Sequence, residues 1–186
     1  MNVQFDTLIL KYSKIYGIPF SIIKGIIEKE SGFNPNAIGD PCKSTKGKRA
    51  YKCPDGKFCS FGLGQANWCS GTAQNFWKVN NYKLLFDPET AIKGIANYLS
   101  YQYKRYGDWK KAISAYNAGT YTKKNPGYVS EVWRNVTKYE LQGKENLSQK
   151  NNTEKKNETE LKNDWLPFVF IAVGIIIIIK TFKNNH

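Results

Sequence analysis

The chain has 186 residues, a length that suits one ordinary domain with short appendages. Residues 1–140 hold 21 Lys and Arg against 10 Asp and Glu, so this part carries most of the formal net charge of +13. A basic domain is attracted to an anionic polymer such as a bacterial wall or a nucleic acid, but no nucleic-acid recognition motif is present and we expect no nucleic-acid partner.

Residues 1–16 have the pattern of an amphipathic helix. Asp6 and Lys11 interrupt its apolar run and no small-residue cleavage site follows, so it is not a signal peptide. Gly17 ends this helix, and Pro19 suits an early position of the next one. The predicted apolar face of the first helix consists of Phe5, Leu8, Ile9, Tyr12, Ile15 and Tyr16.

The second predicted helix carries a carboxylic acid on its apolar side. At about 100° per residue, Ile22, Ile26 and Glu30 stack along one side of this helix. Gly32 is a natural C′ residue, and Pro35 prevents the helix from continuing. Burial and the negative end of the helix dipole are expected to raise the pKa of this carboxyl towards neutrality. A carboxyl that is protonated at neutral pH can serve as general acid for a glycosidic bond.

Glu28 points about 160° away from Glu30 by the same helical arithmetic, and we expect it on the solvated face together with Lys24.

Glu30 could also have a purely structural role instead of a catalytic one. A single buried Glu can simply bind a neighbouring backbone group or an Arg, and the motifs found elsewhere in the chain decide against that alternative.

Residues 34–60 are polar and rich in Lys, Gly and Pro, which predicts a loop or a short hairpin. An even number of cysteines without a close pair favours two disulfides over a zinc site, although free thiols are an alternative. The spacing does not determine the pairing. We expect no bound metal and no cofactor. The four cysteines, in this insertion and just past it, are Cys42, Cys53, Cys59 and Cys69.

The rest of the domain is predicted to be helical. A short helix is expected at residues 72–79, and an N-cap Asp87 followed by Pro88 begins a long one that ends at Gly107. Asp108 caps the next helix, which Gly119 ends, and residues 120–127 form a loop. The last helix of the domain begins near residue 128. Five or six helices with one irregular insertion make a mainly α fold.

Beyond the domain of residues 1–140, the composition changes abruptly. Residues 141–164 contain almost nothing apolar and are predicted to be a disordered polar linker. Residues 165–182 then form an apolar run with Trp165 at one end and Lys180 near the other, which predicts a single transmembrane helix as an anchor in a lipid bilayer.

Four motifs together resemble the lytic transglycosylase family, whose domain has a goose-type-lysozyme-like fold. They are Glu-Ser-Gly-Phe-Asn-Pro at residues 30–35, Gly-Leu-Gly-Gln at 62–65, Ala-Tyr-Asn-Ala-Gly at 115–119, and Tyr-Val at 128–129. The resemblance covers residues 8–140. It implies a mainly α, lysozyme-like (α+β) domain, into which the Cys-bearing insertion is placed and after which the predicted linker and transmembrane helix follow.

The resemblance also implies an activity, cleavage of the β-1,4 bond between N-acetylmuramic acid and N-acetylglucosamine in bacterial peptidoglycan. By analogy, Glu30 protonates the leaving oxygen and then takes the proton of the muramyl 6-hydroxyl, which gives a 1,6-anhydro product. Ser31 would orient Glu30. The residues that would hold the sugar rings or line the site are Gln65, Tyr116, Asn117 and Tyr128.

The sequence departs from the family pattern in places, and two other functions stay open. Gly64 stands where Met is common, and the insertion from Pro41 to Cys59 is long. Asp40 or Asp55 in this region could support a hydrolytic muramidase instead. A catalytically inactive peptidoglycan-binding module is the other alternative.

The charges that flank the apolar run bear on location. More Lys residues precede this run than follow it, and positive-inside counting then places residues 1–140 in the cytoplasm, away from any wall. A single-pass protein in the virion membrane of a bacterial virus would reconcile this orientation with wall cleavage. The competing hypothesis is an enzyme of the bacterial cell envelope.

Overall fold

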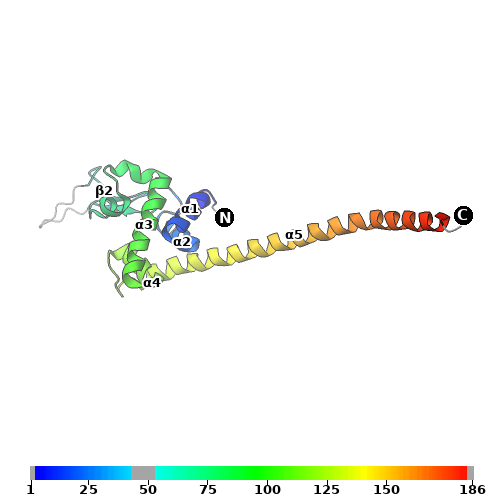
Figure 1. Cartoon of the computed structure of the whole chain (residues 1–186). Helices are drawn as coiled ribbons and strands as arrows, with labels where there is room; N and C mark the ends of the chain where they lie inside the picture. The colour runs from blue at the N-terminus through cyan, green and yellow to red at the C-terminus, as the bar shows by residue number, and fades with distance from the viewer. Residues whose placement is uncertain (1–2, 43–52, 184–186) are drawn as a thin grey trace. The chain divides into compact units, whose positions relative to one another are not determined.

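The computed structural model describes residues 3–42 and 53–183, with side chains up to residue 155 and for residue 157. The chain divides into two compact units, residues 1–140 and 141–186. The first unit is mainly helical with one small sheet, as predicted (Figure 1). Its elements are α1 (Asp6–Tyr16), α2 (Phe20–Ser31), β1 (Ile38–Pro41), β2 (Phe58–Phe61), β3 (Ala66–Asn67), η1 (Ala73–Trp77), η2 (Tyr82–Phe86), α3 (Pro88–Tyr106), α4 (Trp109–Ala118) and the first part of α5 (Pro126–Lys183).

Helix α3 lies at the centre of the helical part and packs against α1, α2, α4, η1 and η2. It begins where predicted, because the Asp87 carboxylate accepts a hydrogen bond from the Thr90 N–H at 2.7 Å and Pro88 occupies the first turn. It ends at Gly107, which has a left-handed backbone. The buried face includes Ile92, Ile95 and Leu99. Helix η2 is an element that the sequence analysis missed.

Helix α1 buries most of its predicted apolar face. Phe5, Ile9 and Tyr12 lie in the core, but Ile15 is 61% exposed, so its predicted place on the buried face is wrong. Tyr16, the next residue of this last turn, packs against the core instead, and Gly17 then ends the helix.

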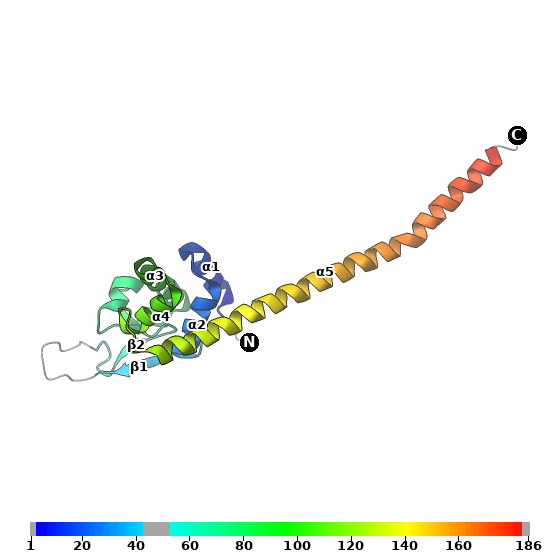
Figure 2. The ribbon, with the colours of Figure 1, turned by 90° about the horizontal axis from the view of Figure 1, so that it is seen from below.

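The predicted hairpin is part of a three-stranded antiparallel sheet in the order β1-β2-β3. Strands β1 and β2 can be followed in Figure 2. Gly39 pairs with Ser60 across β1 and β2, and Ser60 pairs with Asn67 across β2 and β3. Residues 43–52 of the insertion lie outside the described residues. The cysteines on and around the sheet form two disulfides, Cys42–Cys53 and Cys59–Cys69.

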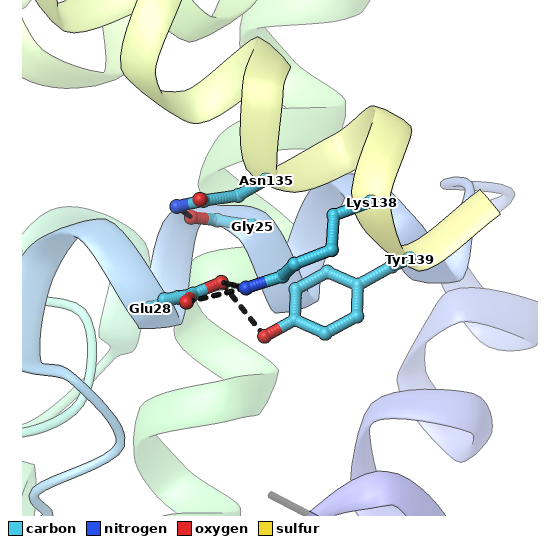
Figure 3. Close-up of polar contacts among 5 residues, drawn as sticks. All are labelled: Gly25, Glu28, Asn135, Lys138 and Tyr139. Carbon is cyan, nitrogen blue, oxygen red and sulfur yellow. Dashed lines mark hydrogen bonds and ion pairs between the residues drawn. The ribbon is translucent and has the colours of Figure 1, made fainter. Parts of the chain in front are cut away.

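Helix α2 and the beginning of α5 pack closely. A Cβ on Gly25 would lie only 3.1 Å from the Val136 Cγ2 and 3.3 Å from the Val132 carbonyl oxygen, so this position has little room for a side chain. The Asn135 amide donates a hydrogen bond to the Gly25 carbonyl oxygen at 3.4 Å (Figure 3). The glycine therefore allows α5 to approach the helix that carries Glu30.

The predicted solvated face of α2 is instead covered, which corrects the expectation for Lys24 and Glu28. Lys24 is 1% exposed, and its ammonium lies 2.6 Å from the Asp6 carboxylate. The Glu28 carboxylate accepts hydrogen bonds from Lys138 at 2.6 Å and from the Tyr139 hydroxyl at 2.7 Å (Figure 3). Helical periodicity predicted one apolar face on α2, but it could not show that α1 and α5 cover the polar face as well.

Residues 141–164 are helical as part of α5, where the sequence analysis predicted a disordered linker. The described side chains there are mostly exposed, in keeping with the polar composition. The helix forms because it extends one that begins at Pro126, and elongation costs far less than nucleation. Lys150 and Glu154, with 3.8 Å between their charged atoms, add a favourable i,i+4 pair.

The predicted membrane anchor at residues 165–182 falls on the last part of α5, where only the backbone is described. Throughout the residues that the structure describes, no helix combines the length and the apolar character needed to cross a bilayer. The anchor therefore stays a prediction from the sequence.

The buried ion pair between α1 and α2 gives a test of the fold. We expect Asp6→Asn to lower the free energy of unfolding by about 3 kcal/mol, because it leaves the Lys24 ammonium buried without its carboxylate. Lys24→Met should cost clearly less, since it removes the charge together with its desolvation penalty. Urea unfolding followed by circular dichroism measures both variants. Equal losses in the free energy of unfolding for the two variants would contradict a destabilising unpaired charge at Lys24.

Candidate active site

Glu30 lies in the last turn of α2, just before the left-handed Gly32 that ends the helix. Its side chain is partly buried and lies at the edge of a cleft. Burial raises the pKa of this carboxyl to about 7, aided by the negative charge of Asp40 and opposed by the Tyr128 hydrogen bond and the charge of Lys29. The carboxyl is thus protonated in a large fraction of molecules at neutral pH.

The Tyr128 phenol, from the first turns of α5, donates a hydrogen bond to the Glu30 carboxyl. The pKa of this phenol is raised well above its ordinary value by burial and by the neighbouring charge of Glu30, so the hydroxyl keeps its proton. Lys29, the residue before Glu30, forms an ion pair with Glu131 of α5. Glu28 also contacts α5, so three consecutive residues of α2, namely Glu28, Lys29 and Glu30, bind the same part of this helix.

Glu28 and Glu30 have opposite electrostatic environments although only one residue separates them. Burial also raises the pKa of Glu28, but the hydrogen bonds from Lys138 and Tyr139 outweigh it and hold that pKa below its ordinary value. Glu30 has no cation in direct contact within the described structure, and its pKa moves the other way. Two carboxyls on one helix thus differ in protonation, because Glu28 is held ionised and Glu30 is partly protonated at neutral pH.

A cleft of about 480 Å³ opens beside Glu30. It brings together four of the residues predicted from the motifs, because Gln65, Tyr116 and Asn117 line it together with Glu30. The other lining residues come mainly from the sheet, from η1 and from the end of α4. They are Gly39, Asp40, Ser60, Gly64, Ala66, Asn67, Ser70, Thr72, Trp77, Tyr98, Ala118 and Gly119.

The glycine-rich turn and the end of α4 are joined at the bottom of this cleft. The buried Tyr116 hydroxyl donates a hydrogen bond to the Gly64 carbonyl oxygen at 2.8 Å. Gln65 has a positive φ of 46°, and its amide bonds back to the Gly62 carbonyl at 3.1 Å. A Cβ on Gly64 would lie 2.5 Å from the Ile95 side chain, so the Met that is common here in the family would require these neighbours to move.

The remaining predicted residues differ in their positions. Asn117 is exposed in the cleft, and its side-chain oxygen accepts a hydrogen bond from the Asn125 amide at 3.2 Å. Ser31 does not line the cleft, and its hydroxyl donates to the Ile27 carbonyl at 3.1 Å within α2. The orientation of Glu30 that was expected from Ser31 is supplied in this structure by Tyr128.

The sheet contributes a polar row that the motif analysis did not include. The Ser60 hydroxyl donates to the Asp40 carboxylate at 2.5 Å and accepts from the Asn67 amide at 3.2 Å. The signal in the sequence was that Ser60 lies two residues before the first glycine of the glycine-rich motif. Asp55, the other carboxylate considered for hydrolysis, does not line the cleft, and it accepts the backbone N–H groups of its own turn instead.

Known proteins resemble this chain over most of its length. It is 28% identical over 139 residues to protein IpgF of Shigella flexneri, covering 73% of this chain and 83% of that protein. It is 27% identical over 148 residues to the invasion protein IagB of Salmonella typhi, covering 78% and 84% of the two chains.

Two solved structures of lytic transglycosylases resemble the domain. The 70 kDa soluble lytic transglycosylase of Escherichia coli matches with a TM-score of 0.48 and 28% identity, over 73% of this chain and 19% of the other. An inactive variant of the lytic transglycosylase Slt from Pseudomonas aeruginosa matches with a TM-score of 0.46 and 23% identity, over 72% and 20%. The chain therefore spans about a fifth of either protein.

The sequence model of one protein family, the Transglycosylase SLT domain, matches residues 7–137 of this chain. This range contains all four motifs, and it confirms the predicted resemblance at the level of the family. Because the match covers well over half of the sequence, the chain belongs to the transglycosylase SLT domain family of lytic-transglycosylase-like proteins.

Proposed function

We propose that this protein is a lytic transglycosylase that cleaves the bond between N-acetylmuramic acid and N-acetylglucosamine in peptidoglycan. The observation that carries the proposal is the Glu30 carboxyl, whose pKa of about 7 and position at the edge of an open cleft suit a general acid. The basic charge of residues 1–140 is in keeping with an anionic wall polymer as substrate.

The proposed reaction uses one carboxyl twice. Glu30 gives its proton to the glycosidic oxygen as the bond from this oxygen to the muramyl anomeric carbon breaks. The resulting carboxylate then takes the proton of the muramyl 6-hydroxyl, whose oxygen bonds to the same carbon and closes the 1,6-anhydro ring. Glu30 is protonated again at the end. Since no water is consumed, a second carboxylate to activate one is unnecessary.

Tyr128, which contacts Glu30 from outside the cleft lining, and three residues that line the cleft have supporting roles in this proposal. The Tyr128 phenol orients the Glu30 carboxyl and stabilises it in the charged state between the two proton transfers. Gln65 and Asn117 present amide groups to the sugar rings, and Tyr116 fixes the turn that carries Gln65 by bonding to Gly64.

Removing the acid gives the first test. We expect Glu30→Gln to lower the rate of peptidoglycan cleavage by about 1,000-fold, because an amide cannot donate the proton. Glu89→Gln is the matched control, since it makes the same chemical change at the exposed partner of Lys11, which does not line the cleft, and should keep the activity. The release of soluble fragments from purified walls measures the cleavage rate of the unsubstituted protein and of both variants. Full activity in Glu30→Gln would remove Glu30 from its role.

Hydrolysis is the second candidate, and it rests on Asp40, which lines the same cleft. If Asp40 activates a water, the products end in reducing sugars and Asp40→Asn loses activity. If transglycosylation is correct, the products are lighter by one water and Asp40→Asn keeps the anhydro product. Mass spectrometry of the released sugars separates the two reactions.

The Tyr128 contact predicts a shift in pH dependence. The phenol stabilises the charged carboxylate, so Tyr128→Phe should raise the pKa of Glu30 above its value of about 7. Activity that requires the protonated acid falls as the pH rises through this pKa, and the alkaline limb should therefore move to higher pH in the variant. The dependence of kcat/KM on pH, measured for both proteins, shows the position of this alkaline limb. An unchanged alkaline limb would show that Tyr128 does not set the pKa of the acid.

Membrane attachment belongs to the same proposal. The apolar run at residues 165–182, with Trp165 and Lys180 near its ends, would tether the enzyme to a bilayer. Two settings suit such an enzyme, the internal virion membrane of a bacterial virus and the envelope of a bacterial cell. They differ in the side of the host membrane on which residues 1–140 lie before wall cleavage.

Protease protection in host cells that express the full chain separates these settings. In the viral setting, residues 1–140 face the cytoplasm, so protease added to intact cells should leave them whole and protease added to lysed cells should cleave them. Cleavage from outside intact cells would exclude the viral setting and support an envelope enzyme. Release of the chain from membranes by salt alone would contradict the anchor in both settings.

A further inference from the structure

The four cysteine sulfurs gather around one point. Cys42 and Cys53 form one disulfide and Cys59 and Cys69 form the other, yet all four Sγ atoms lie within 4.8 Å of one another. Distances between sulfurs of different disulfides are 3.6 Å for Cys42 and Cys59, 3.9 Å for Cys53 and Cys59, and 4.0 Å for Cys53 and Cys69. Two independent disulfides do not require such a common centre.

These three distances match edges of a metal–thiolate tetrahedron, and the two bonded sulfur pairs can reach the same spacing once their disulfides are reduced. A zinc ion bound by four thiolates at about 2.3 Å separates neighbouring sulfurs by about 3.8 Å. We propose that, in the reduced chain, Cys42, Cys53, Cys59 and Cys69 bind one zinc ion as a closed structural site. A thiol reductant such as glutathione first opens the two disulfides, supplying two electrons for each and being itself oxidised to a disulfide. Zinc binding then replaces the four thiol protons, which are released to solvent.

The fold brings the ligands together from positions that are distant in sequence. Cys59 lies in β2, and its carbonyl accepts a hydrogen bond from the Trp68 N–H at 2.8 Å, which places Cys69 beside it. The Cys42 N–H bonds to the Lys57 carbonyl at 2.8 Å and extends the β1–β2 ladder. The sequence contains no short Cys-x-x-Cys pair, so only the pairing of the strands reveals the cluster.

The charge of this region suits the site. One zinc ion with four thiolates has a net charge of −2, and the sequence from residue 43 to residue 52 contributes five Lys and Arg and no acidic residue. Asp55, the nearby acid, is engaged with the backbone N–H groups of Lys57 and Phe58. Positive charge in the sequence between the two ligands Cys42 and Cys53 complements this negative charge.

The consequence for the protein is structural. Four protein ligands leave no open position for a substrate or a water, so the ion would not take part in the chemistry at Glu30. It would instead hold together the sheet that places Asp40, Ser60 and Asn67 along the cleft. This inference does not depend on the reaction that the cleft performs.

Metal content and cobalt spectroscopy test the proposal. The full chain, produced in a reducing cytoplasm and purified with reductant and without chelator, should contain one zinc per molecule. Cobalt(II) added to the reduced, metal-free chain should give the intense visible bands of tetrahedral thiolate coordination. Cys42→Ser and Cys69→Ser, one from each disulfide, should both lose these bands. A chain without zinc that gives no tetrahedral cobalt spectrum overturns the proposal.

A measurement on the unsubstituted chain covers the case in which these variants fail to fold. Zinc should protect all four thiols of the reduced chain from alkylation by iodoacetamide, counted by mass spectrometry, and should raise its melting temperature. The oxidised chain is the control, because disulfides offer no thiolates and zinc should leave its melting temperature unchanged. Full alkylation of the four thiols with zinc present, without a rise in melting temperature, overturns the proposal.

Discussion

The contact between α2 and α5 at Glu30 is the constraint on which the proposed activity depends. A partly buried carboxyl at the end of α2 accepts a hydrogen bond from a phenol, Tyr128, and has no ion pair with a cation among the described residues. The neutral phenol is important for the pKa of Glu30, because a Lys in the same place would lower that pKa and hold the carboxylate ionised. The same helix α5 also binds Lys29 and Glu28, so the turn that carries the acid is held over its whole length.

A buried, partly protonated acid costs stability, and the surrounding structure offsets this cost. The charged form of Glu30 is disfavoured in the folded state, whereas in the unfolded chain its carboxyl ionises freely. Burial of the apolar side of α2, with Ile22, Ile23, Ile26 and Ile27 all fully enclosed, stabilises the helix on the face where the acid lies. On the other face, the ion pairs of Lys24 and Glu28 fix its position against α1 and α5.

The opposite wall of the cleft belongs to the sheet and the glycine-rich turn. Gly64 leaves room for Ile95 and for the Tyr116 hydroxyl, so this departure from the family pattern is matched by the packing around it. None of the four cysteines lines the cleft. Their disulfides can therefore stabilise the strands that form this wall without contacting the cleft.

Much of the fold follows from local patterns in the sequence. The helix boundaries at Gly17, Gly32, Asp87 and Gly107 were predicted because caps and glycines act within one turn of the chain. The catalytic candidate was predicted for the same reason, since a single Glu on an apolar stripe is visible in the periodicity of one helix. The residues that form the cleft around it were predicted only through their motifs.

Tertiary structure decided what periodicity cannot show, namely which partner meets each face. The burial of Lys24, the Tyr128 contact to Glu30 and the row from Asp40 to Asn67 all join segments that are distant in sequence. The convergence of the four cysteines is of the same kind. A sequence specifies the chemistry of each side chain and its local direction, but the pKa and the ligand geometry depend on neighbours that only the packed chain supplies.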